Sequence, residues 1–166
     1  MSLLGCILAC AAAAAPGIII RPGEWYRALA KPCWRPPNWL FGPVWLVLYI
    51  SIAVSGWLVW RDAGPEVAGV ALAIYALQLV LNGLWSVIFF GLHRPGLAFA
   101  EILCLLAAIV ATIAAFYPLH PIAAYILIPY ALWVGFAALL NYSIWRLNPE
   151  RSSSRGPSPH RATPGQ

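Results

Sequence analysis

The chain contains five long runs of apolar residues, and these runs constrain its fold more than any other feature. Each is close to the roughly 20 residues that a helix needs to cross the hydrocarbon of a bilayer. Strands of a membrane barrel are about half as long and alternate apolar with polar residues, which these runs do not. The chain is 62% hydrophobic and only 9% charged, far from the composition of soluble domains. The sequence therefore predicts an all-α membrane protein, a five-transmembrane-helix bundle with spans at about 3–20, 43–60, 67–92, 97–117 and 122–145.

Most connections between these runs are short and rich in helix breakers. The turns at Arg61–Pro65, His93–Gly96 and Pro118–Pro121 each contain proline, so neighbouring helices should pack antiparallel. We expect one transmembrane domain over residues 1–148, with residues 21–42 forming a longer loop. Residues 149–166 are rich in Ser, Pro, Arg and Gly and predict a disordered tail.

The first run also resembles a signal peptide because it ends in a series of alanines. It lacks the positively charged segment that normally opens a signal peptide. A retained first helix is therefore favoured, with cleavage as the alternative.

The distribution of positive charge predicts the orientation of the chain. With five spans, nine of the ten Lys and Arg fall on one side of the membrane, and only Arg61 falls on the other. The positive-inside rule then places the N-terminus outside and the C-terminus in the cytoplasm. A bacterial inner membrane is favoured, with an outer membrane as the alternative. No soluble basic domain is present that would bind nucleic acid.

The third run has two distinct faces at 100° per residue. Tyr75, Gln78, Asn82, Trp85 and Phe89 fall on one side, and polar groups at membrane depth face a partner or a cavity. The opposite stripe is small, which lets helix backbones approach closely. A homodimer contact and packing within the monomer are equally compatible with this stripe, which contains Gly69, Ala73, Ala76 and Gly83.

The second and fifth runs also present aromatic and amide groups on one face. Trp45 and Tyr49 stack in the second run, and Tyr130, Trp133, Ala137 and Asn141 share a broad stripe in the fifth. Three helices can thus direct such groups to a common interior. This predicts a small-molecule pocket, with a packed, ligand-free core as the alternative. Glu101 lies about two turns from Arg94, so we expect its side chain to extend toward the basic side, with a position facing the bundle as the alternative. The four cysteines are dispersed and have no metal-site spacing.

Several motifs point to a known family. The first loop reads Trp-Tyr-Arg-Ala-Leu-Ala-Lys-Pro-Cys-Trp-Arg-Pro-Pro-Asn-Trp over residues 25–39, followed by Pro-Val-Trp at 43–45. Later segments read Asn-Gly-Leu-Trp-Ser at 82–86, Pro-Tyr-Ala-Leu-Trp at 129–133 and Leu-Asn-Tyr-Ser-Ile-Trp-Arg at 140–146. From about Pro16 to Asn148 the chain resembles the TspO/MBR family, the tryptophan-rich sensory proteins related to the mitochondrial translocator protein (peripheral benzodiazepine receptor).

The resemblance implies a five-helix bundle, often dimeric, whose first loop folds as a lid over a pocket. It also implies binding of porphyrins and other tetrapyrroles, and of sterols in animal relatives, without an obligatory cofactor or metal. Leu140, Tyr142 and Arg146 match a weak cholesterol-motif pattern. Transferred motif by motif, the ligand-binding residues would be Trp25, Tyr26, Trp34, Trp45, Tyr49, Asn82, Trp85, Trp133, Ala137 and Asn141.

Three functions remain open from the sequence. The first is a porphyrin-binding protein that acts in porphyrin handling and in stress- or oxygen-linked sensing through an unknown signalling partner. The second is a light- and oxygen-dependent porphyrin-degrading enzyme, with Trp45 and Trp133 as its redox-active side chains. No other catalytic set is expected, because His93, His120 and His160 have no paired carboxylate. The third is a transporter of tetrapyrroles or sterol-like lipids, which would normally show broken helices or internal repeats.

Overall fold

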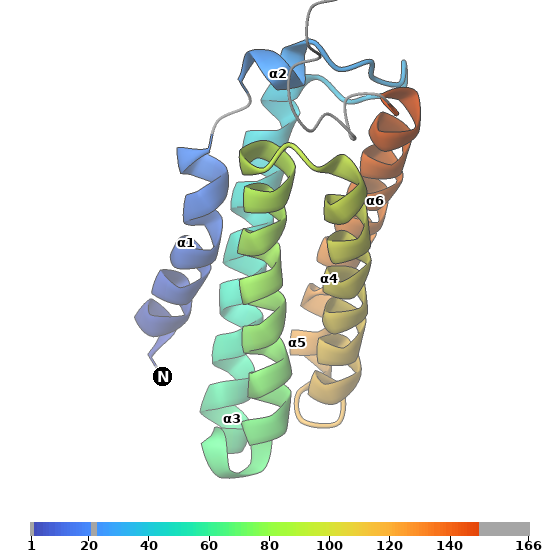
Figure 1. Ribbon diagram of the computed structural model, residues 1–166. Coiled ribbons are helices and arrows are strands. Elements are labelled where there is room, and N and C mark those ends of the chain that lie inside the picture. Colours follow the sequence, from blue (N-terminus) through green and yellow to red (C-terminus); the bar gives the residue numbers. More distant parts are fainter. Residues whose placement is uncertain (1, 21–22, 150–166) are drawn as a thin grey trace, which may run out of the picture.

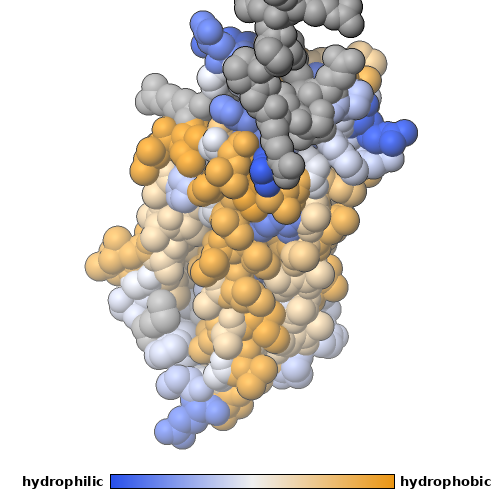
Figure 2. Space-filling model, viewed as in Figure 1, coloured by the Kyte–Doolittle hydropathy of each residue, from blue (hydrophilic) through white to orange (hydrophobic). Residues whose placement is uncertain are grey.

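The computed structural model describes residues 2–20 and 23–149, and throughout these residues its regular structure is helical. The helices run side by side in a bundle, with the short α2 (Glu24–Arg27) lying across one end (Figure 1). The surface seen in Figure 2 is apolar across its middle and hydrophilic toward both ends. By length and composition, three helical stretches among the described residues can cross a bilayer: Asn38–Gly91, Pro95–Phe116 and Pro121–Leu147. The chain is an integral membrane protein.

Helix α3 (Asn38–Ser86) is a helical hairpin rather than a straight rod. Its chain reverses at Gly64, whose φ of 68° and ψ of 167° belong to a region that only glycine adopts readily. Residues 38–63 form the first arm and residues 65–86 the second arm. Pro65 begins the second arm, where its missing N–H leaves no helical hydrogen bond unmade. The predicted loop at Arg61–Pro65 is thus reduced to a tight turn, and the first arm begins at Asn38 rather than at residue 43.

Charged groups stabilise the turn at Gly64. Arg61 Nε lies 2.5 Å from Asp62 Oδ1, and His120 Nε2 lies 3.1 Å from Asp62 Oδ2. The hydrogen bond from Arg61, together with the positive charges nearby, holds the pKa of the Asp62 carboxyl below its usual value. These contacts join the α3 turn to the start of α5 (Pro121–Ile126) at one end of the bundle.

The remaining helices follow the apolar runs closely. They are α1 (Leu3–Ile19), the π-helix η1 (Val87–Gly91) that ends the second arm, α4 (Pro95–Phe116), α5 (Pro121–Ile126) and α6 (Ile128–Leu147). The fifth run is divided at Leu127, two residues before Pro129. Proline lacks an N–H and its ring clashes with the preceding turn, which accounts for the break at this point. Between α1 and α3, the short α2 (Glu24–Arg27) lies inside the predicted loop 21–42.

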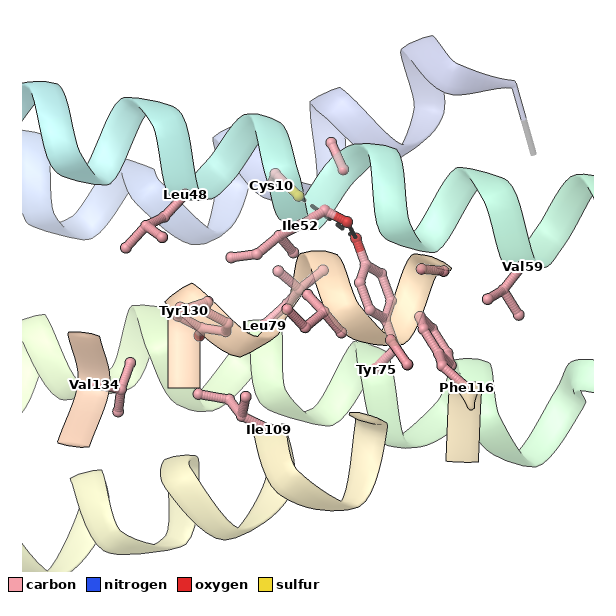
Figure 3. Packing of buried hydrophobic residues seen from close by; sticks show 14 of the residues in the cluster. Cys10, Leu48, Ile52, Val59, Tyr75, Leu79, Ile109, Phe116, Tyr130 and Val134 are labelled. Carbon is pink, nitrogen blue, oxygen red and sulfur yellow. Dashed lines mark hydrogen bonds between the residues drawn. The ribbon is translucent and has the colours of Figure 1, made fainter. Parts of the chain in front are cut away.

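Helix α1 packs in parallel on the second arm of α3, at the edge of the bundle (Figure 1). Gly83 allows this contact, since a Cβ at this position would lie 3.1 Å from the Ala13 carbonyl oxygen. Farther along, Cys10 Sγ lies 3.6 Å from Tyr75 Oη, which also donates a hydrogen bond to the Ile52 carbonyl (Figure 3). Gly83 therefore mediates packing within the monomer. It is buried, and so is not available for the dimer contact that was one of its two predicted roles.

Candidate ligand-binding cavity

A cavity of about 980 Å³ lies inside the helical bundle. This volume is at the upper end of the range for small-molecule sites. Its walls come from α1, both arms of α3, η1, α4 and α6, and α2 contributes Tyr26 and Arg27 at one end. The sequence prediction of a common interior, rather than a fully packed core, agrees with this cavity.

Eight of the ten predicted ligand-binding residues line the cavity: Tyr26, Trp45, Tyr49, Asn82, Trp85, Trp133, Ala137 and Asn141. The other two, Trp25 and Trp34, are not among the lining residues. Trp25 packs against His93 with a centroid distance of 4.4 Å, and Trp34 packs edge-on against Phe136 at 5.7 Å. These two tryptophans attach the first loop to the bundle and do not form the wall of the cavity.

Aromatic rings form much of the wall. Trp45 lies 5.4 Å from Tyr49, Trp85 stacks on Phe89 at 5.1 Å, and Trp133 meets Phe41 edge-on at 5.7 Å. Rings at these separations hold one another in place. The wall therefore presents large, fixed apolar faces of the kind that suit a flat ligand.

A chain of hydrogen bonds crosses the interior beside these rings. Tyr49 Oη donates to Asn82 Oδ1 at 2.5 Å, and Asn82 Nδ2 donates to Tyr130 Oη at 2.9 Å. Tyr130 Oη in turn donates to Gln78 Oε1 at 3.0 Å. Because buried polar groups are costly without partners, this chain fixes the relative positions of both α3 arms and α6.

A second pair of hydrogen bonds joins the second arm of α3 and α6 to α4. Trp85 Nε1 donates to Asn141 Oδ1 at 3.1 Å, and Asn141 Nδ2 donates to the Pro95 carbonyl at 2.7 Å. Trp85 and Asn141 thus orient each other at the start of α4. The indole N–H of Trp133 is different: it is buried and has no hydrogen-bond partner among the described residues.

The first loop lies at one end of the cavity, where Tyr26 and Arg27 line it, and we refer to this loop as the lid. Asn148 holds it through a pair of hydrogen bonds with one residue: Ala30 N donates to Asn148 Oδ1 at 3.0 Å, and Asn148 Nδ2 donates to Ala30 O at 2.9 Å. Lys31 Nζ donates to the carbonyls of Arg27 and Leu29. Burial, and then repulsion from Arg35, lower the pKa of Lys31.

Glu101 faces the bundle, so the favoured prediction for its side chain is wrong and the alternative holds. Its side chain does not extend to the basic end; it is buried, with 8% exposure, and neither carboxylate oxygen has a partner among the described residues. The reason is its helical position, because Glu101 lies on the stripe between Ala98 and Leu105, both buried against the bundle.

The residues of the sterol-like motif do not share one surface. Leu140 is buried and lines the cavity, whereas Tyr142 and Arg146 are exposed on α6. Tyr142 instead packs against Phe99, with a centroid distance of 5.2 Å.

Sequence reasoning missed the contribution of α1 to the cavity. Leu3, Ile7, Cys10, Ala11, Ala14, Gly17 and Ile18 all line it. Their spacing of three and four residues marks one face of a helix. The signal is weak because α1 is apolar on every side.

The chain is similar to known proteins over most of its length. The model of the TspO/MBR family matches residues 4–146. The chain is 43% identical to protein CrtK of Rhodobacter capsulatus over 143 residues, which covers 86% of this chain and 89% of that protein. It is 43% identical to the human translocator protein over 127 residues, or 75% of each chain. It is 38% identical to the tryptophan-rich sensory protein of Cereibacter sphaeroides over 149 residues, or 90% of this chain and 92% of the relative. The chain belongs to the TspO/MBR family.

Proposed function

We propose that the cavity binds a tetrapyrrole of the protoporphyrin type, and that the protein acts in porphyrin handling and stress- or oxygen-linked sensing. The observation that carries this proposal is the cavity wall itself, in which Trp45, Trp85 and Trp133 surround one space together with Asn82 and Asn141. Flat aromatic ligands stack on indole rings or meet their edges. The N–H of Trp133, which has no partner among the described residues, is a donor for the polar edge of such a ligand.

Charge at the lid end fits the same ligand. Arg27 lines the cavity from α2, and Lys31 and Arg35 follow in the same loop. A guanidinium group pairs strongly with a carboxylate, so the propionates of a porphyrin would lie at this end with the ring deeper among the tryptophans.

We further propose five membrane crossings, formed by α1, the two arms of α3, α4, and α5 together with α6. The described basic residues support the N-outside orientation. Arg27, Lys31, Arg35, Arg94 and Arg146 belong to the lid, the η1–α4 turn and the end of α6, all at one end of the bundle (Figure 1). The positive-inside rule places this end in the cytoplasm.

The proposed ligand is tested by titrating protoporphyrin IX into the protein in nanodiscs and following the absorbance of the porphyrin. We expect saturable binding that Trp45→Phe/Trp133→Phe weakens by about tenfold, because two ring contacts become smaller. Trp57→Phe/Trp60→Phe is the control, since neither residue lines the cavity. The absence of saturable binding, or equal loss in both variants, would refute the proposal.

Light-dependent porphyrin breakdown is a second candidate, and the position of Trp45 and Trp133 in the same cavity favours it. Illumination of the bound porphyrin with and without oxygen distinguishes it from binding alone. Product that forms only with oxygen and only with both tryptophans present would establish the enzyme. Equal product yield in Trp45→Phe/Trp133→Phe would rule out their redox role.

A further inference from the structure

The cavity extends well beyond the aromatic chamber. The chamber, defined by Trp45, Tyr49, Asn82, Trp85 and Trp133, lies toward the lid. From there the lining continues down α1 through Ala11 and Ile7 to Leu3, and down the first arm of α3 to Val54. We call this lower part, lined by Leu3, Ile7, Cys10, Ala11, Ile50, Ala53 and Val54, the tail groove.

The helix contacts show how far the tail groove extends. Gly17 and Gly83 set the register of α1 on the second arm, and the Tyr49–Asn82 hydrogen bond sets the register of the two arms. Together these contacts place Ala14 near the depth of Asn82, with Leu3 eleven residues farther along. At 1.5 Å per residue, the α1 side of the groove reaches about 16 Å past the hydrogen-bonded chain, and the side formed by the first arm, which ends at Val54, reaches about 8 Å.

The two parts of the cavity differ in polarity. The tail groove contains aliphatic side chains and one thiol, that of Cys10, which contacts Tyr75 Oη at 3.6 Å. By contrast, Arg27, Asn38 and the chamber amides lie toward the other end. A ligand that fills the whole cavity is therefore an amphiphile, with its polar ring near the lid and a hydrocarbon portion along α1.

The groove is also open to its side. Ile7, Leu46 and Ile50 line the cavity, yet they are 47%, 63% and 57% exposed. The opening lies where residues of α1 and of the first arm of α3 line the cavity together. In a chain that spans the membrane, this side faces lipid hydrocarbon.

We propose that the tail groove holds a long hydrocarbon chain attached to the ring that occupies the chamber. The ligand class would then be tetrapyrrole esters of a long-chain alcohol, which enter sideways from the bilayer. This inference rests on the proposed function. The occupant is the ligand's own chain rather than a phospholipid, because the lining of the lower end carries no charged side chain to hold a headgroup.

The test uses a monoester of protoporphyrin IX whose long alkyl chain carries a terminal diazirine. After illumination in nanodiscs, mass spectrometry locates the adduct. We expect it on the tail-groove residues near Leu3 and Ile7, and we expect excess protoporphyrin IX monomethyl ester to abolish it by displacing the ring.

Two matched variants test the groove itself. Ala11→Phe fills the groove, whereas Ala12→Phe puts the same ring on an exposed neighbour that does not line it. Ala11→Phe should lower the adduct yield by about tenfold through steric exclusion, with the methyl ester still bound, and Ala12→Phe should leave it unchanged. Ile50→Trp tests the opposite wall in case Ala11→Phe does not fold.

The outcomes separate this inference from the proposed function. If neither ester binds, the proposed function itself fails. If both esters bind but the adduct lies elsewhere, the inference that the tail groove holds the hydrocarbon chain is wrong, while binding of the ring in the chamber stands. An adduct that survives excess methyl ester would show that the groove takes any hydrocarbon chain, such as a bilayer acyl chain, which would also overturn the inference.

Discussion

The Asn82 side chain connects both arms of α3 with α6. It accepts from Tyr49 and donates to Tyr130 at the same time. Asn82→Leu should therefore leave two buried hydroxyls short of a partner and destabilise the protein by about 1–3 kcal/mol. Tyr49→Phe removes only one of these bonds and should have a smaller effect. Thermal unfolding in detergent, followed by tryptophan fluorescence, gives the comparison, and an Asn82→Leu variant as stable as the parent would contradict it.

The sequence predicted individual residues unequally well. Asn82, Trp85 and Asn141 were placed correctly because a polar or aromatic group stands out on an apolar helix and must face inward. The favoured direction for the Glu101 side chain was wrong because it was inferred from the distance to Arg94 along the helix. The side chain instead points into the bundle, because its position on the helix falls on the buried stripe. Trp25 and Trp34 lie in the loop, where no helical period indicates whether a ring faces the cavity or a neighbouring side chain.

At the scale of the elements, the contact between α1 and the second arm of α3 depends on the lack of a side chain at Gly83. Gly83→Val would place its side chain against the Ala13 backbone and should destabilise the protein by about 1–3 kcal/mol through overpacking. Gly135→Val in α6 is the control, since a Cβ there has nothing within 4 Å and Gly135 is not part of the proposed dimer surface. Melting temperatures measured in one detergent give the comparison, and similar losses in both variants would mean that valine disturbs its own helix rather than the contact with α1.

The element boundaries were predictable to within a few residues because apolar runs end where breakers begin. The reversal at Gly64 is shorter than the loop predicted from the composition of residues 61–65. A single glycine with positive φ makes the turn instead. The division of the small stripe was not predictable. Gly83 and Ala76 lie on one helical face, but α1 covers Gly83 and leaves Ala76 exposed. The helical period of the stripe does not indicate where α1 packs.

At the scale of the whole molecule, the uncovered part of this stripe is the proposed surface for a homodimer. Gly69, Ala73 and Ala76 are exposed, and small residues let two helices approach closely in a membrane. Ala73→Leu/Ala76→Leu should shift the protein toward monomer in light scattering of the detergent complex. A dimer fraction equal to that of the parent would exclude this surface.

The orientation of the molecule is testable through a native thiol. Cys33 is exposed in the lid, which the proposed topology places in the cytoplasm. A membrane-impermeant maleimide should therefore label Cys33 in inverted vesicles and not in intact cells. Asp62→Cys in a Cys33→Ser background should show the opposite pattern, because the α3 turn lies at the other end of the bundle (Figure 1). Labelling of Cys33 from outside would reverse the assignment.

The position of α1 also has a consequence for biosynthesis. Its packing partner, the second arm of α3, follows only after the lid and the whole first arm have been synthesised. Since chains emerge from the ribosome N-terminus first, α1 enters the bilayer before the surface that covers it exists. A helix in that situation has to be compatible with lipid on every side. This explains why α1 is apolar all round, even though one of its faces ends up against another helix.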